Sequence, residues 1–276
     1  MKKYLTCLSI AGSDPSCGAG IQADLKTFSA LGVYGLTVLT ALTVQDTRGV
    51  RGVFPVSADC VEAQLESIFE DINPAFVKIG MLADAAIIRT VVKVLKTYRP
   101  QFVLLDPILV SSSGYPLLSS DAVVLLKAQL IPFCSLVTPN LPEACVLMGI
   151  DGADSIQMDE DNLMKMGRVM RGSMQQTDLL IKGGHREGDA ADILFEERET
   201  RIYSSERIKT KNTHGTGCTL SAAITAYRAM GYRVPESVER AKDYLRRAME
   251  SGKDIVLGHG NGPLNHFFAP ECQIIK

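Results

Sequence analysis

Several features are missing from this chain of 276 residues, and each absence excludes a class of protein. No uninterrupted apolar stretch approaches the roughly 20 residues that a membrane-spanning helix needs, so no membrane span is expected. The formal net charge is −2 and the basic residues are dispersed, which gives no sign of a nucleic-acid or anionic-membrane partner. No Cys-x-x-Cys pair occurs among the seven scattered cysteines. This pattern predicts free thiols in a reducing cytoplasm and argues against a disulfide or zinc framework.

The usual nucleotide-binding motifs are also missing. The standard phosphate-binding loop, G-x-x-x-x-G-K-[ST], does not occur. A dinucleotide-binding motif is incomplete, because Gly18 and Gly20 are followed by Ala23 and no acidic residue closes the expected second strand, Gly35–Thr43. If the chain binds a phosphate, it must do so through another arrangement.

Apolar, β-branched segments alternate with longer amphipathic segments, which is typical of a mostly parallel sheet covered by helices on both faces. The opening segment has two lysines and a short apolar run, and we expect a strand there and not a signal peptide. Strands are expected at Tyr4–Ala11, Gly35–Thr43, Phe76–Ile79, Phe102–Leu105, Leu136–Thr138 and Asp178–Ile181. Helices are expected at Ala19–Leu31, Ser57–Ile72, Ala85–Tyr98, Ser119–Leu130, Leu141–Met148, Asp159–Met174, Gly217–Met230 and Pro235–Ser251.

Two further strands, Ile193–Glu197 and Thr200–Ser204, flank the pair Arg198-Glu199 and predict an antiparallel hairpin at one edge of the sheet. No repeat, low-complexity segment or linker interrupts the pattern. We therefore expect one α/β domain over residues 1–276, with a loosely held tail from about Ala269.

Polar or glycine-rich residues follow six of the expected strands, where ligands of open parallel sheets bind. These exits are Gly12-Ser13-Asp14, Gln45-Asp46, Gly80-Met81, Asp106-Pro107, Pro139-Asn140 and Lys182-Gly183-Gly184-His185. A single exit of this kind would mean little. Their number predicts that a site lies at this edge of the sheet.

The segment from Thr213 to Ser221 places two glycines at the start of a helix, directly after a polar loop. A helix start leaves backbone N–H groups without intrahelical partners, and these groups with the helix dipole form a site for an anion. Cys218 lies in the first turn, where a thiolate would be stabilised. The segment predicts that a phosphate is held beside a titratable group, although an ordinary glycine-rich turn before a core helix also fits.

Phosphoryl transfer needs charge neutralisation and positioning, and three strand exits offer the residues for it. Lys182 is placed to reach a triphosphate, and Asp106 and Glu143 could hold Mg²⁺ directly or through water. Asn140 could orient a phosphate or a metal-bound water. It also fits the N-cap of the helix that follows, and the two roles are compatible.

A series of motifs runs in order from residue 5 to about residue 265. The motifs are Ala11-Gly12-Ser13-Asp14, Gly18-Ala19-Gly20-Ile21-Gln22-Ala23-Asp24-Leu25-Lys26, Thr40-Ala41-Leu42-Thr43-Val44-Gln45, Val77-Lys78-Ile79-Gly80-Met81-Leu82, Asp106-Pro107, Thr138-Pro139-Asn140-Leu141-Pro142-Glu143, Lys182-Gly183-Gly184-His185 and Asn212-Thr213-His214-Gly215-Thr216-Gly217-Cys218. Together they resemble the hydroxymethylpyrimidine/phosphomethylpyrimidine kinases of thiamine biosynthesis. One departure is Cys17, which stands where the family would have glycine.

The resemblance implies the ribokinase-like fold, an α/β/α sandwich with a central, mostly parallel sheet and an edge hairpin. It implies that ATP phosphorylates 4-amino-5-hydroxymethyl-2-methylpyrimidine to its monophosphate and then to the diphosphate. Mg²⁺ would take part, and the need for a monovalent cation stays open. The resemblance also implies a homodimer with small-molecule substrates.

The resemblance further assigns roles to single residues. Gln45 would bind the aminopyrimidine edge, because its amide can both donate and accept. Asp24 and the Gly12 backbone would fix the acceptor, and Met81 and Val110 would pack against the flat ring, although core packing alone also accounts for both side chains. Nucleotide-binding residues would be Asn140, Lys182, Gly184 and Thr213, and the metal would lie at Asp106 and Glu143.

The resemblance also implies that Gly215, Thr216 and Gly217 would form an anion hole. Cys218 occupies the position where sugar-kinase relatives have an aspartate base. Its thiol would need a lowered pKa to act at neutral pH, and the helix start is expected to lower it. His185 and His214 are expected to be hydrogen-bonded scaffold, and no spacing predicts a zinc site.

Three alternatives remain. Pyridoxal kinase has a related fold, and dual activity is possible, although Cys218 and Gln45-Asp46 favour the pyrimidine. An NAD-dependent oxidoreductase would fit the strand–helix alternation, but its glycine motif is incomplete. A regulatory module could bind a nucleotide without turnover. The presence of Lys182, Asp106, Glu143 and Cys218 argues against it.

Overall fold

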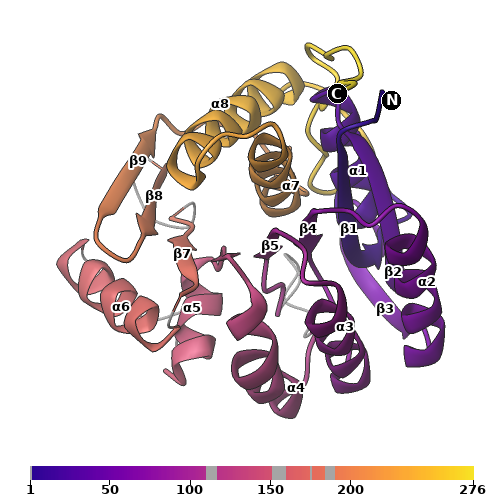
Figure 1. The fold of residues 1–276 in the computed structure, drawn as a ribbon. Helices are drawn as coiled ribbons and strands as arrows, with labels where there is room; N and C mark the ends of the chain where they lie inside the picture. The colour runs from indigo at the N-terminus through magenta and orange to yellow at the C-terminus, as the bar shows by residue number, and fades with distance from the viewer. Residues whose placement is uncertain (1, 110–116, 151–159, 175, 184–189) are drawn as a thin grey trace.

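The computed structural model describes residues 2–109, 117–150, 160–174, 176–183 and 190–276 (Figure 1). Within them, nine strands form a single sheet in the order β3-β2-β1-β4-β5-β6-β7-β8-β9. The strands are β1 (Thr6–Ser13), β2 (Tyr34–Asp46), β3 (Gly49–Pro55), β4 (Phe76–Ile79), β5 (Phe102–Leu105), β6 (Leu136–Val137), β7 (Asp178–Ile181), β8 (Ala190–Phe195) and β9 (Thr200–Ser205). Six neighbouring strands, β2, β1, β4, β5, β6 and β7, are parallel to one another. At one edge β3 pairs antiparallel with β2, and at the other edge β8 pairs antiparallel with both β7 and β9.

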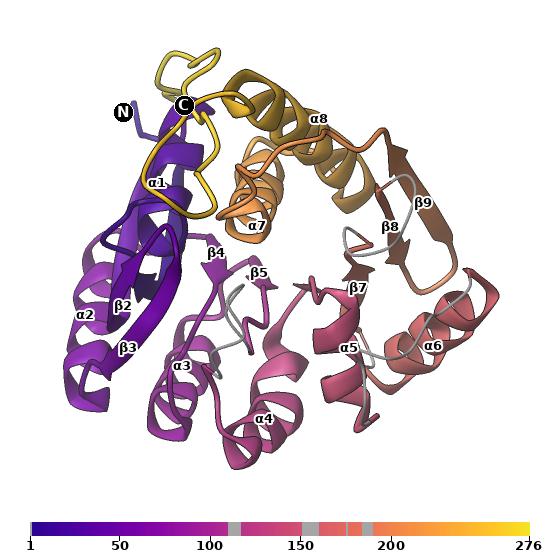
Figure 2. The same cartoon turned by 180° about the vertical axis from the view of Figure 1, so that it is seen from behind.

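Helices cover both faces of the sheet, as Figures 1 and 2 show from opposite sides. They are α1 (Gly20–Ala30), α2 (Ala58–Asp71), α3 (Ala85–Tyr98), α4 (Ser120–Leu125), α5 (Leu141–Met148), α6 (Glu160–Ser173), α7 (Thr216–Ala229) and α8 (Val234–Gly252). One buried apolar cluster joins the sheet to α1, α7 and α8, and another joins it to α2 through α6. The mostly parallel sheet covered on both faces, which the strand–helix alternation predicts, is therefore confirmed, and with it the α/β/α sandwich that the resemblance implies.

Local sequence signals account for several helix ends. Ser57 caps α2 by accepting a hydrogen bond from the backbone of Cys60, as the sequence predicts. Asn140 and Glu143 form a capping box at the start of α5, in which each side chain accepts from the backbone N–H of the other residue. Gly149 then ends α5 in the left-handed conformation, with φ of 70°. These signals fix where α5 begins, and this places Asn140 and Glu143 at the carboxyl end of β6.

The structure differs from the sequence expectation at the β3 edge and at the C-terminal tail. Strand β3 was not expected, because its two glycines and terminal proline are weak strand formers. It pairs with β2 in an antiparallel register that sets Leu42 opposite Phe54. The tail is not loose: Lys276 exchanges two backbone hydrogen bonds with Lys3, and Ile274 bonds to Leu5 and to Gly32.

Cys17, the residue that departs from the expected glycine, has a φ of 61°. This left-handed conformation is the one that glycine adopts most easily, so the loop keeps the glycine geometry with a cysteine in it.

Candidate active site

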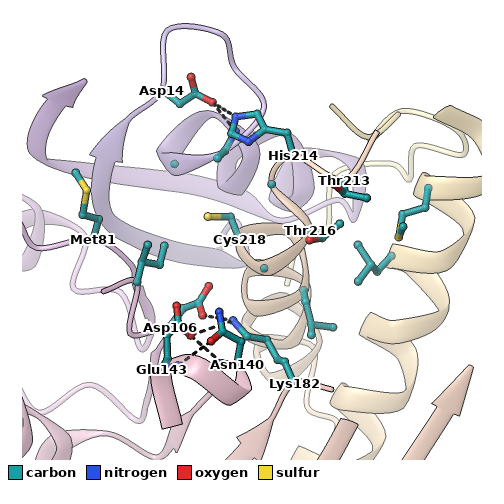
Figure 3. Close-up of a pocket in the computed structure, with 18 of the residues that line it drawn as sticks. Asp14, Met81, Asp106, Asn140, Glu143, Lys182, Thr213, His214, Thr216 and Cys218 are labelled. Atoms are coloured by element: carbon teal, nitrogen blue, oxygen red, sulfur yellow. Dashed lines mark hydrogen bonds and ion pairs between the residues drawn. The ribbon is translucent and has the colours of Figure 1, made fainter. Parts of the chain in front are cut away.

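A cavity of about 1290 Å³ opens at the carboxyl ends of the parallel strands. The strand order reverses between β1 and β4, and such reversals are where open α/β sheets bind ligands. Gly12, Ser13 and Asp14 at the end of β1 line the cavity, as do Met81 after β4 and Asp106 after β5. Gln45, Asn140 and Lys182 line it as well, so all six expected strand exits contribute. Figure 3 shows Asp14, Met81, Asp106, Asn140 and Lys182 among the side chains of the cavity.

The loop before α7 forms one wall of the cavity. Gly215 is the N-cap residue of α7 and has a φ of 86°, which favours glycine. A Cβ atom there would lie 1.8 Å from the carbonyl oxygen of Gly18, so the close contact between the two loops also requires glycine. The same wall also includes Thr213, which precedes Gly215, and Thr216, Gly217 and Cys218, which follow it. The backbone N–H groups at such a helix start are the ones that lack intrahelical partners, and the anion site there stays a prediction.

Facing that turn is a buried cluster of one lysine and two carboxylates (Figure 3). Lys182 Nζ lies 2.6 Å from Asp106 Oδ1 and 4.0 Å from Glu143 Oε2. A Cβ on Gly217 would lie 3.4 Å from Lys182 Nζ and 3.6 Å from Asp106 Oδ2. The cluster therefore lies next to the start of α7, so the two elements expected to bind phosphate are neighbours in the cavity.

The charges in this cluster shift one another's pKa values. Burial by itself raises the pKa of Asp106, but Lys182 and Lys78 outweigh burial, and the net pKa is lowered. Burial raises the pKa of Glu143 to about 7, against the attraction of Lys182 and with a further rise from Asp106. Burial lowers the pKa of Lys182, and the two carboxylates more than reverse this effect. The cluster thus keeps an ammonium group and at least one carboxylate charged at neutral pH.

Cys218 lies in the first turn of α7 and lines the cavity, with 6% of its surface exposed. Burial raises the pKa of its thiol to about 11, although Lys78 and the backbone N–H of Gly20 lower it. Asp24 and Asp106 raise it further. The expectation that the helix start gives a lowered pKa is therefore wrong, because the loss of hydration outweighs the helix start.

Asp24 does not line the cavity. Its side chain is fully buried behind the loop after β1, where Oδ2 accepts from Ser9 at 2.5 Å and pairs with Lys78 Nζ at 2.8 Å. The expectation that Asp24 helps to fix the acceptor stays a prediction, and any such role would act through the residues around it. Its carboxylate neutralises a lysine that is itself fully buried.

Three of the remaining predicted acceptor residues, Gly12, Gln45 and Met81, line the same cavity. A Cβ on Gly12 would lie 2.5 Å from Met81 Cε, so glycine allows the methionine to approach the backbone of β1. Met81 is 7% exposed and is held by a hydrogen bond from Thr40 to its carbonyl oxygen. Gln45 extends from the end of β2. Val110, Gly184 and His185 lie outside the described residues.

Sequence reasoning missed a loop that braces the cavity from outside. The backbone N–H groups of His259 and Gly260 donate to Thr47 Oγ1, and that of Asn261 donates to Thr47 O. Gly262 O accepts from the backbone N–H of His214. The loop therefore ties the β2–β3 turn, next to Gln45, to the loop before α7. Three glycines between residues 258 and 262 were the available signal.

The fold and this cavity define a small-molecule kinase of the ribokinase-like class. A model of the phosphomethylpyrimidine kinase family matches residues 14–265, and the chain belongs to that family. This membership rules out the oxidoreductase alternative and argues against a regulatory module without turnover.

Individual relatives agree with the family match. The hydroxymethylpyrimidine/phosphomethylpyrimidine kinase of Escherichia coli K12 is 46% identical over 268 residues, which cover 97% of this chain and 99% of that protein. A crystal structure of phosphomethylpyrimidine kinase from Clostridium difficile 630 is 42% identical, with a TM-score of 0.76, and covers 88% of this chain and 99% of its own. An ADP complex of Bacillus subtilis pyridoxal kinase is 34% identical, with a TM-score of 0.86, and covers 96% of this chain and 98% of its own.

Proposed function

We propose that this enzyme transfers the γ-phosphate of ATP to 4-amino-5-hydroxymethyl-2-methylpyrimidine and then phosphorylates the product to the diphosphate, in thiamine biosynthesis. One observation carries the proposal: a single cavity joins Gln45, which suits an aminopyrimidine, to the anion site at Gly215–Cys218. The family match over residues 14–265 supports the same reaction.

At the acceptor end, the Gln45 amide pairs with the amino group and ring nitrogen of the pyrimidine. Met81 packs against the flat ring of the pyrimidine, and the Gly12 backbone beside Met81 limits how deeply the ring enters the cavity. Val110 completes this end in the proposal. The hydroxymethyl group then points toward Cys218 and the start of α7.

At the phosphate end, the N–H groups of Gly215, Thr216 and Gly217 bind the transferred phosphoryl group. Lys182 neutralises the negative charge that develops on the β,γ-bridging oxygen as ADP leaves. Asn140, Gly184 and Thr213 complete the nucleotide site in the proposal.

Asp106 and Glu143 fit a Mg²⁺ ion, because Mg²⁺ prefers carboxylate oxygens and is commonly held by one or two of them together with substrate phosphates. Within the described part of the chain, no group of three or more His, Cys, Asp or Glu side chains could hold a metal. That finding suits an ion shared with the phosphates. When bound, the ion would neutralise phosphate charge, and the need for an additional monovalent cation stays open.

The two steps place different demands on Cys218. In the first, the alcohol oxygen bonds to the γ-phosphorus, the bond to ADP breaks, and the alcohol proton passes to the sulfur of Cys218 in its thiolate form. Because burial raises the pKa of this thiol to about 11, Cys218 must first lose its own proton to solvent. In the second, the attacking oxygen belongs to a phosphate and carries no proton that must leave. We therefore propose that Cys218 acts as the base in the first step and contributes much less to the second.

Pyridoxal kinase activity is a second candidate, because the Bacillus subtilis pyridoxal kinase matches the fold over 96% of this chain. We further propose that the enzyme acts in the cytoplasm as a homodimer. Seven free cysteines suit a reducing compartment. Exposed apolar side chains at Leu42, Val44 and Phe54 give the β2–β3 edge a surface suited to a second copy. Among the described helices, none is long and apolar enough to cross a membrane.

A coupled assay of ADP release with each of the two alcohols tests the proposal. We expect turnover with the aminopyrimidine alcohol, and then with its monophosphate, at a higher kcat/KM than with pyridoxal. Turnover with pyridoxal alone would replace the proposal by the second candidate.

A further inference from the structure

The amide of Gln45 has two polar neighbours inside the protein, Thr43 and His214. Its Oε1 lies 3.1 Å from Thr43 Oγ1, and its Nε2 lies 3.3 Å from His214 Nε2. The two ends of a glutamine amide have nearly the same shape, so hydrogen-bond partners decide which end is oxygen and which is nitrogen.

Thr43 requires nitrogen at its end of the amide. Its hydroxyl group lies 2.8 Å from the carbonyl oxygen of Ser13, which can only accept. The hydroxyl has a single proton, and this bond uses it. The oxygen of Thr43 can then only accept, so the amide group that faces it must be the NH₂ of Gln45.

His214 requires oxygen at the other end. Its Nε2 lies 2.8 Å from Asp14 Oδ2. Burial raises the pKa of Asp14, but hydrogen bonds from His214, Ser16 and the Ala19 backbone outweigh burial and lower the pKa to about 2. Asp14 is therefore an anion, and His214 Nε2 carries the proton that it donates to Asp14. A second N–H group facing that nitrogen would be repelled, whereas the oxygen of Gln45 can share the proton.

The parts that hold the amide are themselves fixed. Asp14 is 2% exposed and also accepts from the backbone N–H groups of Ser16, Gly18 and Ala19. The His214 ring packs against Gly18, where a Cβ would lie 2.2 Å from Cδ2. Figure 3 shows Asp14 facing His214, which lies in the loop before α7.

From this proton inventory we infer that Asp14, His214 and Thr43 are positioning residues that lock the orientation of the Gln45 amide. One N–H and one oxygen lone pair of the amide stay free, side by side, toward the cavity. This donor–acceptor pair is complementary to a 4-aminopyrimidine, whose exocyclic amino group lies next to a ring nitrogen. The inference rests on the proposed function and makes the locked amide the determinant that selects the amino group of the substrate.

The experiment compares two acceptors, the aminopyrimidine alcohol and the same alcohol without its 4-amino group. His214→Phe keeps a ring against Gly18 but removes the N–H, and His214→Gln restores a donor. His259→Phe is the matched control, because that histidine is exposed. ADP release gives KM and kcat for each enzyme and each acceptor.

We expect His214→Phe to raise KM for the amino acceptor about 5- to 10-fold, since about one hydrogen bond to substrate loses its orientation, with kcat within about twofold. KM for the acceptor without the amino group should stay within about twofold, and His214→Gln should recover part of the preference. Equal rises in KM for both acceptors, or an unchanged KM for the amino acceptor, would overturn the inference.

Thr43→Val gives an independent variant if His214→Phe does not fold. It keeps the shape of the side chain and removes the acceptor for the amide NH₂. It should weaken the preference for the amino acceptor in the same direction, and an unchanged preference would overturn the inference. If the wild-type enzyme phosphorylates neither acceptor, the proposed function fails first, and the inference falls with it.

Discussion

Replacing Lys182 by methionine removes the ammonium group that lies between Asp106 and Glu143. Asp106 is 1% exposed and loses the first of the two lysines that lower its pKa, and Glu143 is 6% exposed. Breaking a buried ion pair by removing one partner costs about 3–5 kcal/mol, because the other charge stays buried. Glu143 has a pKa of about 7 and can take up a proton, which reduces the penalty. We therefore expect Lys182→Met to lower the free energy of unfolding by about 3 kcal/mol at neutral pH.

A double-mutant cycle separates this effect from a simple loss of packing. Asp106→Asn should lower the free energy of unfolding by less than Lys182→Met does. In that variant Lys182 still has a carboxylate partner, because Glu143 lies 4.0 Å away. The double variant should be more stable than the sum of the single effects predicts, by about 2 kcal/mol, because no unpaired charge remains on Asp106. Urea denaturation of all four proteins measures these values. Lys253→Met, which removes an exposed lysine from its pair with Glu250, is the control and should leave stability nearly unchanged. Strictly additive effects would refute this account of the cluster.

Three further predictions follow from single contacts. Gln45→Leu should leave two polar groups of the aminopyrimidine unpaired and weaken its binding by about 1–3 kcal/mol, and an unchanged KM would remove Gln45 from the acceptor site. His266 is 2% exposed, and burial, with a contribution from Lys26, lowers its pKa to about 4. Unfolding exposes a histidine that binds a proton near pH 6.5, so wild-type stability should fall by about 2 kcal/mol from about pH 7.5 to about pH 5, and His266→Gln should flatten that slope. Equal slopes in urea titrations of the two proteins would contradict this assignment. Gly215→Ala should abolish both phosphorylation steps or prevent folding, whereas Gly172→Ala, where the added Cβ meets nothing within 4 Å, should be tolerated. An active Gly215→Ala enzyme would show that the close contact with the neighbouring loop is dispensable.

Much of the fold could be predicted because its signals are local. The strands Phe76–Ile79 and Phe102–Leu105 and the helix Ala85–Tyr98 have the expected bounds, since each is a short apolar run or a clear helical period. Parallel topology then brings the strand ends together, so the strand exits met in one cavity as expected. Strand β3 was missed because its pairing depends on register with β2, which no local pattern specifies.

At the site, burial accounts for what the sequence could not predict. Asp24 lies at helical spacing with Ile21 and Phe28, on the buried face of α1, but its partner Lys78 is 54 residues away in the sequence. Local pattern could place the carboxylate on a helix but could not find the lysine that neutralises it. For Cys218, the helix start is a local feature and the loss of hydration is a tertiary one, so the sequence predicted the wrong direction for the thiol pKa.

The central claim is that one anion site serves two phosphorylations, while the sulfur of Cys218 is needed as a base in the first of them. The most direct measurement is the rate of each step in Cys218→Ala, with the alcohol and the monophosphate supplied as separate substrates. The account predicts a loss of about 10²–10⁴-fold with the alcohol and a change within about tenfold with the monophosphate. Equal losses in the two steps would contradict it.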